Sequence, residues 1–188
     1  MPPLSQGLVQ VYTGDGKGKT TAALGLAMRA VGHDLRVCFI QFAKSDRDKG
    51  ERRTVERLAP DLEIHAFAAS HWGDPGKAPP GTPWWLLPPS DEDRSKAQEG
   101  LLFAQRAVAE GDYDVVILDE ILAALTHSLV SLEQVMDLVR SKPPQVELVL
   151  TGRNVPEEIV AVADLVTEMK AVKHPFARGV TARRGIEY

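Results

Sequence analysis

A glycine-rich segment near the N-terminus carries the clearest chemistry in this chain. Residues 13–21 read Thr-Gly-Asp-Gly-Lys-Gly-Lys-Thr-Thr, directly after an apolar run and before a segment with helical periodicity. Glycines there let main-chain N–H groups turn toward one anion, and a helix start adds a partial positive charge. Lys19 would reach a phosphate, and the hydroxyl of Thr20 would bind Mg²⁺. The segment therefore predicts a nucleotide phosphate site.

The spacing of this loop differs from the usual phosphate-loop pattern. G-x-x-x-x-G-K-[ST] would place a glycine at position 13, where this chain has Thr13. The alternative interpretation is a glycine-rich turn that binds nothing, but the preceding strand, the following helix and the Lys-Thr pair all favour the loop. The predicted nucleotide-binding residues are Gly14, Asp15, Gly16, Lys17, Gly18, Lys19, Thr20 and Thr21.

An acidic pair after a second apolar run would complete such a site. Residues 114–120 read Asp-Val-Val-Ile-Leu-Asp-Glu. An acid that ends a buried strand lies at the carboxyl edge of the sheet, where open α/β folds bind ligands. Asp119 is therefore predicted as a second metal ligand with Thr20, although an Asp-Glu pair in this position can also cap a helix. Glu120 could orient a water or stabilise the helix start, and its position does not decide between these roles.

The elements that must position these residues alternate along the chain. We expect strands at residues 8–13, 35–42, 62–67, 113–118 and 146–151, and helices at residues 19–31, 51–58, 91–110, 132–140 and 156–163. Ser90 and Ser131 are expected to cap two of the helices. The alternation predicts one α/β domain over residues 1–188, of the P-loop NTPase-like (RecA-like) class, with a mostly parallel sheet and helices on both faces. A Pro/Gly-rich surface loop is expected at about residues 73–90, and it contains Trp84 and Trp85.

Composition limits the remaining possibilities. The chain has 188 residues, 44% hydrophobic content and a net charge of -4, which is typical of a globular domain and gives no general attraction to nucleic acid or to anionic membranes. The one cysteine, Cys38, is interpreted as a core residue. No apolar run approaches the roughly 20 residues of a membrane span, and the first residues lack a signal-peptide pattern. We therefore expect a cytoplasmic location, with neither nucleic acid nor membrane as a partner.

Further motifs in the chain resemble one family throughout. The phosphate loop is followed in order by Gln41–Lys44, Gly50–Glu51, Leu118–Ile121, Thr151–Arg153, Ala163–Met169, Val172–Pro175 and Ala182–Tyr188. With these motifs the sequence is similar to the corrinoid adenosyltransferases of the phosphate-loop type, from about residue 7 onward.

The resemblance implies a specific reaction. A corrinoid reduced to Co(I) attacks the 5′ carbon of ATP and expels triphosphate, in the formation or salvage of adenosylcobalamin. It implies catalytic roles for Lys19, Thr20, Asp119 and Glu120, with Mg²⁺ or Mn²⁺ as cofactor. It also implies a homodimer and a reductant such as a flavoprotein. Trp72 aligns with an aromatic residue near the corrinoid, and Arg153 is expected at the ligand edge of the sheet.

A rival hypothesis keeps the loop but changes the reaction. A phosphotransferase or NTP hydrolase would use Glu120 to orient the acceptor or a water, and it would release ADP in place of triphosphate. A nucleic-acid ATPase is disfavoured by the acidic charge balance. A corrinoid carrier that binds ATP without cleaving it is the remaining alternative.

Overall fold

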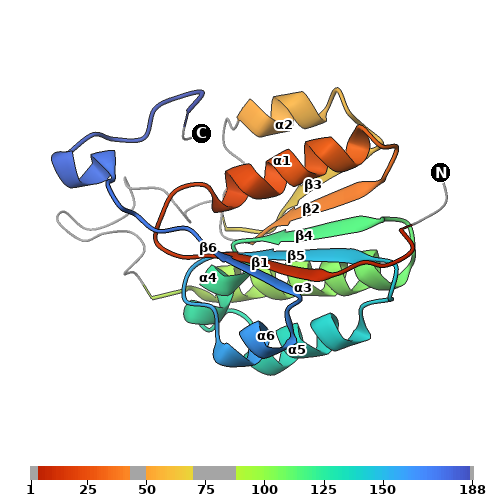
Figure 1. Ribbon diagram of the computed structural model, residues 1–188. Helices are drawn as coiled ribbons and strands as arrows, with labels where there is room; N and C mark the ends of the chain where they lie inside the picture. The colour runs from red at the N-terminus through yellow and green to blue at the C-terminus, as the bar shows by residue number, and fades with distance from the viewer. Residues whose placement is uncertain (1–3, 43–49, 70–87, 187–188) are drawn as a thin grey trace.

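The computed structural model describes residues 4–42, 50–69 and 88–186. Within them lies a six-stranded sheet in the order β3-β2-β4-β5-β1-β6, in which every pairing is parallel (Figure 1). The strands are β1 (Val9–Thr13), β2 (Val37–Gln41), β3 (Leu62–Ala66), β4 (Val115–Asp119), β5 (Glu147–Thr151) and β6 (Leu165–Glu168). The predicted α/β class with a parallel sheet is confirmed.

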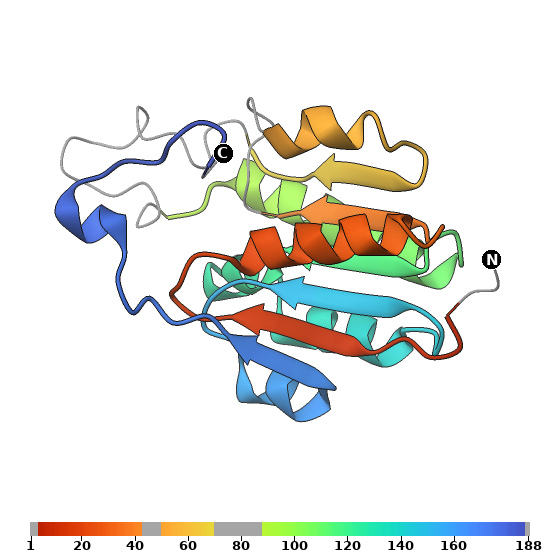
Figure 2. The same ribbon diagram turned by 45° about the horizontal axis from the view of Figure 1, so that its top comes forward.

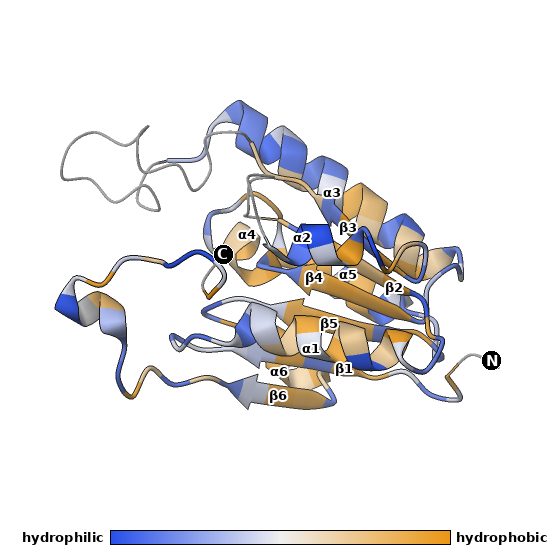
Figure 3. Cartoon of the chain, turned by 90° about the horizontal axis from the view of Figure 1, so that it is seen from above, coloured by the Kyte–Doolittle hydropathy of each residue, from blue (hydrophilic) through white to orange (hydrophobic). Residues whose placement is uncertain are grey.

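Helices cover both faces of this sheet (Figure 1). One face carries α1 (Lys19–Val31) and α2 (Gly50–Val55), and the other carries α3 (Asp91–Ala109), α4 (Ile121–Thr126), α5 (Leu132–Ser141) and α6 (Glu157–Val162). A short 3-10 helix, η3 (Pro175–Arg178), follows β6. Hydrophobic residues are concentrated in the strands (Figure 3), as expected where helices bury both faces of a parallel sheet.

The predicted elements correspond well to those in the structure, and three elements were missed. All five predicted strands are present, and α1 has the predicted bounds. Both capping serines are confirmed, because Ser90 accepts from the Asp93 N–H and Ser131 from the Gln134 N–H. The elements α4, η3 and β6 were not predicted from the sequence. β6 has four exposed residues at the sheet edge, so it shows no alternation of buried and exposed positions.

Further predictions concerned Cys38, the Pro/Gly-rich loop and membrane-spanning segments. Cys38 is fully buried, and this burial is the main cause that raises its pKa to about 12, which confirms it as a core residue. Of the predicted loop at about 73–90, residues 73–87 lie outside the described residues, as do Trp72, Trp84 and Trp85. Among the described helices, none combines the length and apolarity needed to cross a bilayer.

The direction of the strands brings the predicted site together. Because all six strands are parallel, they end at the same edge of the sheet. The phosphate loop follows β1 there, Asp119 ends β4 and Thr151 ends β5. After β6 the chain continues beyond this edge, and its last described residues return to the phosphate loop (Figure 2). The carboxyl edge of the sheet therefore holds the residues that the sequence predicts for the site.

Candidate functional site: a phosphate-loop cleft at the carboxyl edge

The loop between β1 and α1 has the backbone that its glycines predict. Gly14 and Gly18 adopt φ of 100° and 126°, values that other residues rarely take. The loop also packs closely against residues 169–170: a Cβ on Gly16 would lie 2.7 Å from the Met169 carbonyl oxygen. The Gly16 N–H donates to that same oxygen at 2.6 Å. The amide of Gly16 is therefore directed at the C-terminal segment and not at the centre of the loop, unlike the arrangement expected from the sequence.

Lys19 begins α1 and is almost completely buried, with 7% of its surface exposed. Its ammonium donates to the carbonyl oxygens of Gly14 at 2.6 Å and Gly16 at 2.8 Å. A buried ammonium held across its own loop places a positive charge beside the loop amides. Lys19 is thus placed where the sequence predicts a phosphate contact.

Thr20 is bound to the predicted acidic residue of β4. Its hydroxyl donates to Oδ1 of Asp119 at 2.9 Å, although the two residues are 99 positions apart. The same Oδ1 accepts from the hydroxyl of Thr151 at 2.8 Å, and Asp119 and Thr151 have no exposed surface. A hydroxyl and a carboxylate in contact are oxygen ligands suited to Mg²⁺, which retains several waters and phosphate oxygens. The two predicted metal ligands therefore meet in the structure.

Glu120 occupies a turn that the sequence did not define. It precedes α4 with φ of 62° and ψ of 23°, in the left-handed region, and its N–H donates to Oγ1 of Thr151 at 2.9 Å. A non-glycine residue in this region is uncommon and often marks a functional site. Thr151 therefore holds both neighbouring acids, Asp119 through its side chain and Glu120 through its backbone.

A cleft of about 510 Å³ opens above this arrangement. Its lining includes seven residues of the phosphate loop region, the acidic Glu120 and the basic Arg153. The loop residues in the lining are Asp15, Gly16, Lys17, Gly18, Lys19, Thr20 and Thr21. Asp119 lies beneath the cleft, bonded to Thr20, and Gly14 contributes its carbonyl oxygen to Lys19. Trp72 lies outside the described residues, so its predicted contact stays a prediction.

The other wall of the cleft comes from residues that were not among the predicted site residues. His174, Gly185 and Ile186 line it from the C-terminal segment, and the Lys17 ammonium donates to the Ile186 carbonyl oxygen at 3.1 Å. Gly50 and Glu51 of α2 line the cleft as well. The residues of the C-terminal segment and those of α2 lie in motifs on which the family resemblance rests. That resemblance was the one feature of the sequence that pointed to them. Spacing alone could not bring residue 186 to residue 17.

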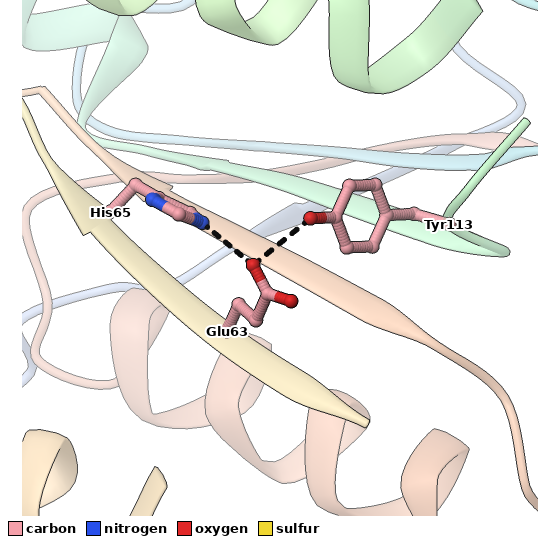
Figure 4. Close-up of polar contacts among 3 residues, drawn as sticks. All are labelled: Glu63, His65 and Tyr113. Atoms are coloured by element: carbon pink, nitrogen blue, oxygen red, sulfur yellow. Dashed lines mark hydrogen bonds and ion pairs between the residues drawn. The ribbon is translucent and has the colours of Figure 1, made fainter. Parts of the chain in front are cut away.

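Two other features of the described structure contain polar or titratable side chains. A hollow of about 540 Å³ lies between α3, the segment between α4 and α5, and residues 154–156. Its amides pair with each other, since Gln134 donates to Gln98 at 2.9 Å and Gln98 donates to the Leu129 carbonyl oxygen at 2.8 Å. On β3, Glu63 accepts from Tyr113 and contacts His65 (Figure 4). Neither feature adjoins the phosphate loop, so the cleft is the candidate site.

The fold and the site define the class of this protein. A glycine-rich loop between β1 and α1, a buried lysine and a threonine bonded to an aspartate at the end of β4 form the phosphate-loop arrangement of nucleotide-binding α/β proteins. The family described as "ATP:corrinoid adenosyltransferase BtuR/CobO/CobP" matches residues 5–188. The chain belongs to this family of corrinoid adenosyltransferases.

Individual relatives agree with the family match. The chain is 34% identical to the corrinoid adenosyltransferase of Escherichia coli K12 over 97% of its own length and 86% of the relative's. It is 32% identical to corrinoid adenosyltransferase CobA of Salmonella typhimurium, over 97% of this chain and 86% of that one. Both alignments extend over nearly the whole chain, beyond the phosphate loop.

A solved structure supports the fold independently of the sequence. The crystal structure of flagellar accessory protein FlaH from Methanocaldococcus jannaschii superposes with a TM-score of 0.57, covering 88% of this chain and 72% of that one. The two sequences are 14% identical. At this identity the likeness concerns the fold alone.

Proposed function

We propose that the cleft transfers the 5′-deoxyadenosyl group of ATP to the Co(I) centre of a reduced corrinoid. The cobalt electron pair forms the bond to the 5′ carbon, while the bond from that carbon to the triphosphate oxygen breaks and triphosphate leaves. The observation that carries this proposal is the family match over residues 5–188, joined to a phosphate loop that lines a cleft.

The residues of the cleft would act mainly on the leaving group. Because cobalt is the nucleophile, the protein has to align the ribose carbon and stabilise the charge on the departing triphosphate. Lys19 supplies a buried positive charge, and Lys17 adds an exposed one at the cleft wall. Thr20 and Asp119 would hold Mg²⁺ or Mn²⁺, which supplies Lewis-acid stabilisation of the phosphate oxygens when bound.

Further contacts follow from the lining of the cleft. Arg153 is exposed at its rim, where we propose a contact with a phosphate oxygen or a corrinoid amide. Trp72 is proposed as an aromatic contact for the corrinoid. We also propose a homodimer, a reductant such as a flavoprotein and a cytoplasmic location. The exposed edge strand β6, where Leu165 and Val166 are 40% and 41% exposed, is compatible with a second copy of the chain.

A second candidate function has one observation in its favour. Glu120 lines the cleft beside the phosphate loop, where a carboxylate would orient a water or an acceptor hydroxyl. A phosphotransferase or hydrolase of this kind would release ADP. The identity of the phosphate product therefore separates the two functions.

The test incubates the protein with ATP, Mg²⁺ and a chemically reduced corrinoid, while the corrinoid absorbance is recorded and the phosphate product is identified. We expect a light-sensitive alkylcobalt species and triphosphate. Lys19→Ala should lower the rate by at least about 100-fold, because it removes the buried charge that faces the triphosphate. Lys96→Ala is the matched control, since Lys96 is paired with Glu99 on the exposed surface of α3. ADP and orthophosphate without a change at cobalt would contradict the proposal.

A further inference from the structure

Gln41 is the last residue of β2 and has no exposed surface. Among the described residues, neither its Oε1 nor its Nε2 has a hydrogen-bond partner. Buried amides are nearly always paired, because leaving one unpaired costs folding stability. Even the half-buried amides of Gln98 and Gln134 are paired, because Gln134 donates to Gln98. An amide kept unpaired in the interior therefore requires a reason other than stability.

The backbone places Gln41 beside Asp119. The two residues are register partners in the parallel pairing of β2 with β4, and the Phe42 N–H donates to the Asp119 carbonyl oxygen at 3.0 Å. The Gln41 carbonyl oxygen accepts from the Phe67 N–H at 2.8 Å. Hydrogen bonds on both sides of β2 thus fix the position of this residue.

The alternation of side chains along the strands puts Gln41 on the face that carries α1. Phe39, two residues before Gln41, packs with the alanines of α1. Ile117 and Val149 also pack there, and they precede Asp119 and Thr151 by two residues each. Because side chains alternate between the faces of a sheet, Gln41, Asp119 and Thr151 share that face. They form a buried polar row across the ends of β2, β4 and β5, and Thr20 of α1 contacts its middle member.

We propose that Gln41 is a positioning residue for the bound metal–nucleotide complex, and this inference rests on the proposed function. The two members of the row nearest the loop already have partners, since Oδ1 of Asp119 accepts from Thr20 and Thr151. Gln41 brings an acceptor and a donor to the same edge. Its Oε1 would accept from a water bound to the cation, and its Nε2 would donate to a phosphate oxygen.

This role predicts opposite effects of one substitution on stability and on binding. Gln41→Met keeps the length of the side chain and removes both polar atoms. The ligand-free protein should become more stable, with its melting temperature raised by about 2–4 °C, because the unpaired amide is gone. Affinity for MgATP, measured by calorimetry without corrinoid, should fall about tenfold, the size of effect typical of outer-shell metal contacts.

Gln98→Met is the matched control, because it removes an amide that has partners. It should lower the melting temperature and leave MgATP affinity unchanged. A Gln41→Met protein that binds MgATP as tightly as the wild type, or that melts at a lower temperature, would overturn the inference. The two proposals fail separately: a wild type that makes ADP refutes adenosyl transfer, whereas equal MgATP affinities refute the role of Gln41 alone.

Discussion

Two carboxylates in this protein have similar partners and different surroundings. Asp119 accepts hydrogen bonds from two hydroxyls, those of Thr20 and Thr151. Glu63 accepts from the Tyr113 hydroxyl at 3.0 Å and contacts the His65 ring nitrogen at 3.1 Å (Figure 4). By residue type, the Glu63 cluster resembles a catalytic site more than the Asp119 cluster does, because histidine is the most common general acid or base.

Their positions in the sheet separate them. Asp119 ends β4, is fully buried and is bonded to a residue that lines the phosphate-loop cleft. Glu63 is the second residue of β3, and its side chain and that of His65 remain 32% and 33% exposed. His65 also packs against Phe103 of α3, with ring centroids 4.4 Å apart. We infer that the Glu63 cluster joins β3 to α3 and β4, whereas the Asp119 cluster serves the ligand.

The position of a carboxylate along its strand decides which parts of the protein it contacts. Parallel strands present their last residues to the ligand, so an acid at the end of a strand meets the phosphate loop. An acid near the start of a strand meets the neighbouring elements. Substitutions in the two clusters should therefore change different observables.

The largest effect is expected for Asp119→Asn. Both hydroxyls donate to one oxygen of Asp119, and the asparagine carbonyl oxygen can accept both bonds. The fold should therefore persist, while loss of the negative charge should weaken Mg²⁺ binding and lower adenosylation about 100-fold or more. Mg²⁺ titrations of the reaction rate measure this loss. Glu63→Gln is the matched change in the other cluster and should keep the wild-type rate; an equal loss in both variants would end the distinction.

An intermediate effect is expected for Thr151→Val. The substitution removes the hydroxyl that accepts from the Glu120 N–H and donates to Asp119. The loss of these hydrogen bonds should lower the unfolding free energy by about 1–3 kcal/mol. Adenosylation should fall about tenfold as Asp119 loses its orientation. Denaturant unfolding measures the loss of stability, and rate measurements follow the loss of adenosylation. Thr151→Ser keeps the hydroxyl and should retain most of the activity. Wild-type activity in Thr151→Val would show that the hydrogen bond from Thr151 is not needed to orient Asp119.

The smallest effect is expected for Tyr113→Phe, and it depends on pH. Burial, then the nearby Cys38 and the hydrogen bond to Glu63, raise the pKa of the Tyr113 phenol. Below pH 9 the variant should lose about 0.5–1 kcal/mol of unfolding free energy with the hydrogen bond. Above pH 10 the unfolded wild type releases this proton while the folded wild type retains it, so wild-type stability falls.

The difference in unfolding free energy between wild type and Tyr113→Phe should therefore shrink from pH 9 to pH 11. Denaturant unfolding at each pH measures it, and the other tyrosines are common to both proteins. Adenosylation at neutral pH should be unchanged. A constant difference across this range would argue against the raised pKa, and a loss of activity would argue that the Glu63 cluster belongs to the site.

The residue pattern was enough to predict the fold class and the central residues of the candidate site. Val, Leu and Ile runs marked five strands of a sheet that helices cover on both faces, and β2, β4 and β5 are buried along their whole length. The Gly-Lys-Thr segment marked the phosphate loop, in which Gly14 and Gly18 take positive φ. Thr20 and Asp119 could be paired in advance, since strand ends and loops of a parallel sheet meet at one edge. The family motifs indicated the chemistry.

The distant residues that complete the cleft could not be predicted from the residue pattern. The contact of Lys17 with Ile186 joins residues 169 positions apart, and the Gly16 amide is directed at Met169, neither of which follows from local periodicity. The unpaired amide of Gln41 and the partners of Thr151 depend on strand order and register, which place residues from three strands side by side. Local propensity acts over a few neighbours along the chain, whereas these contacts exist only after the sheet has assembled.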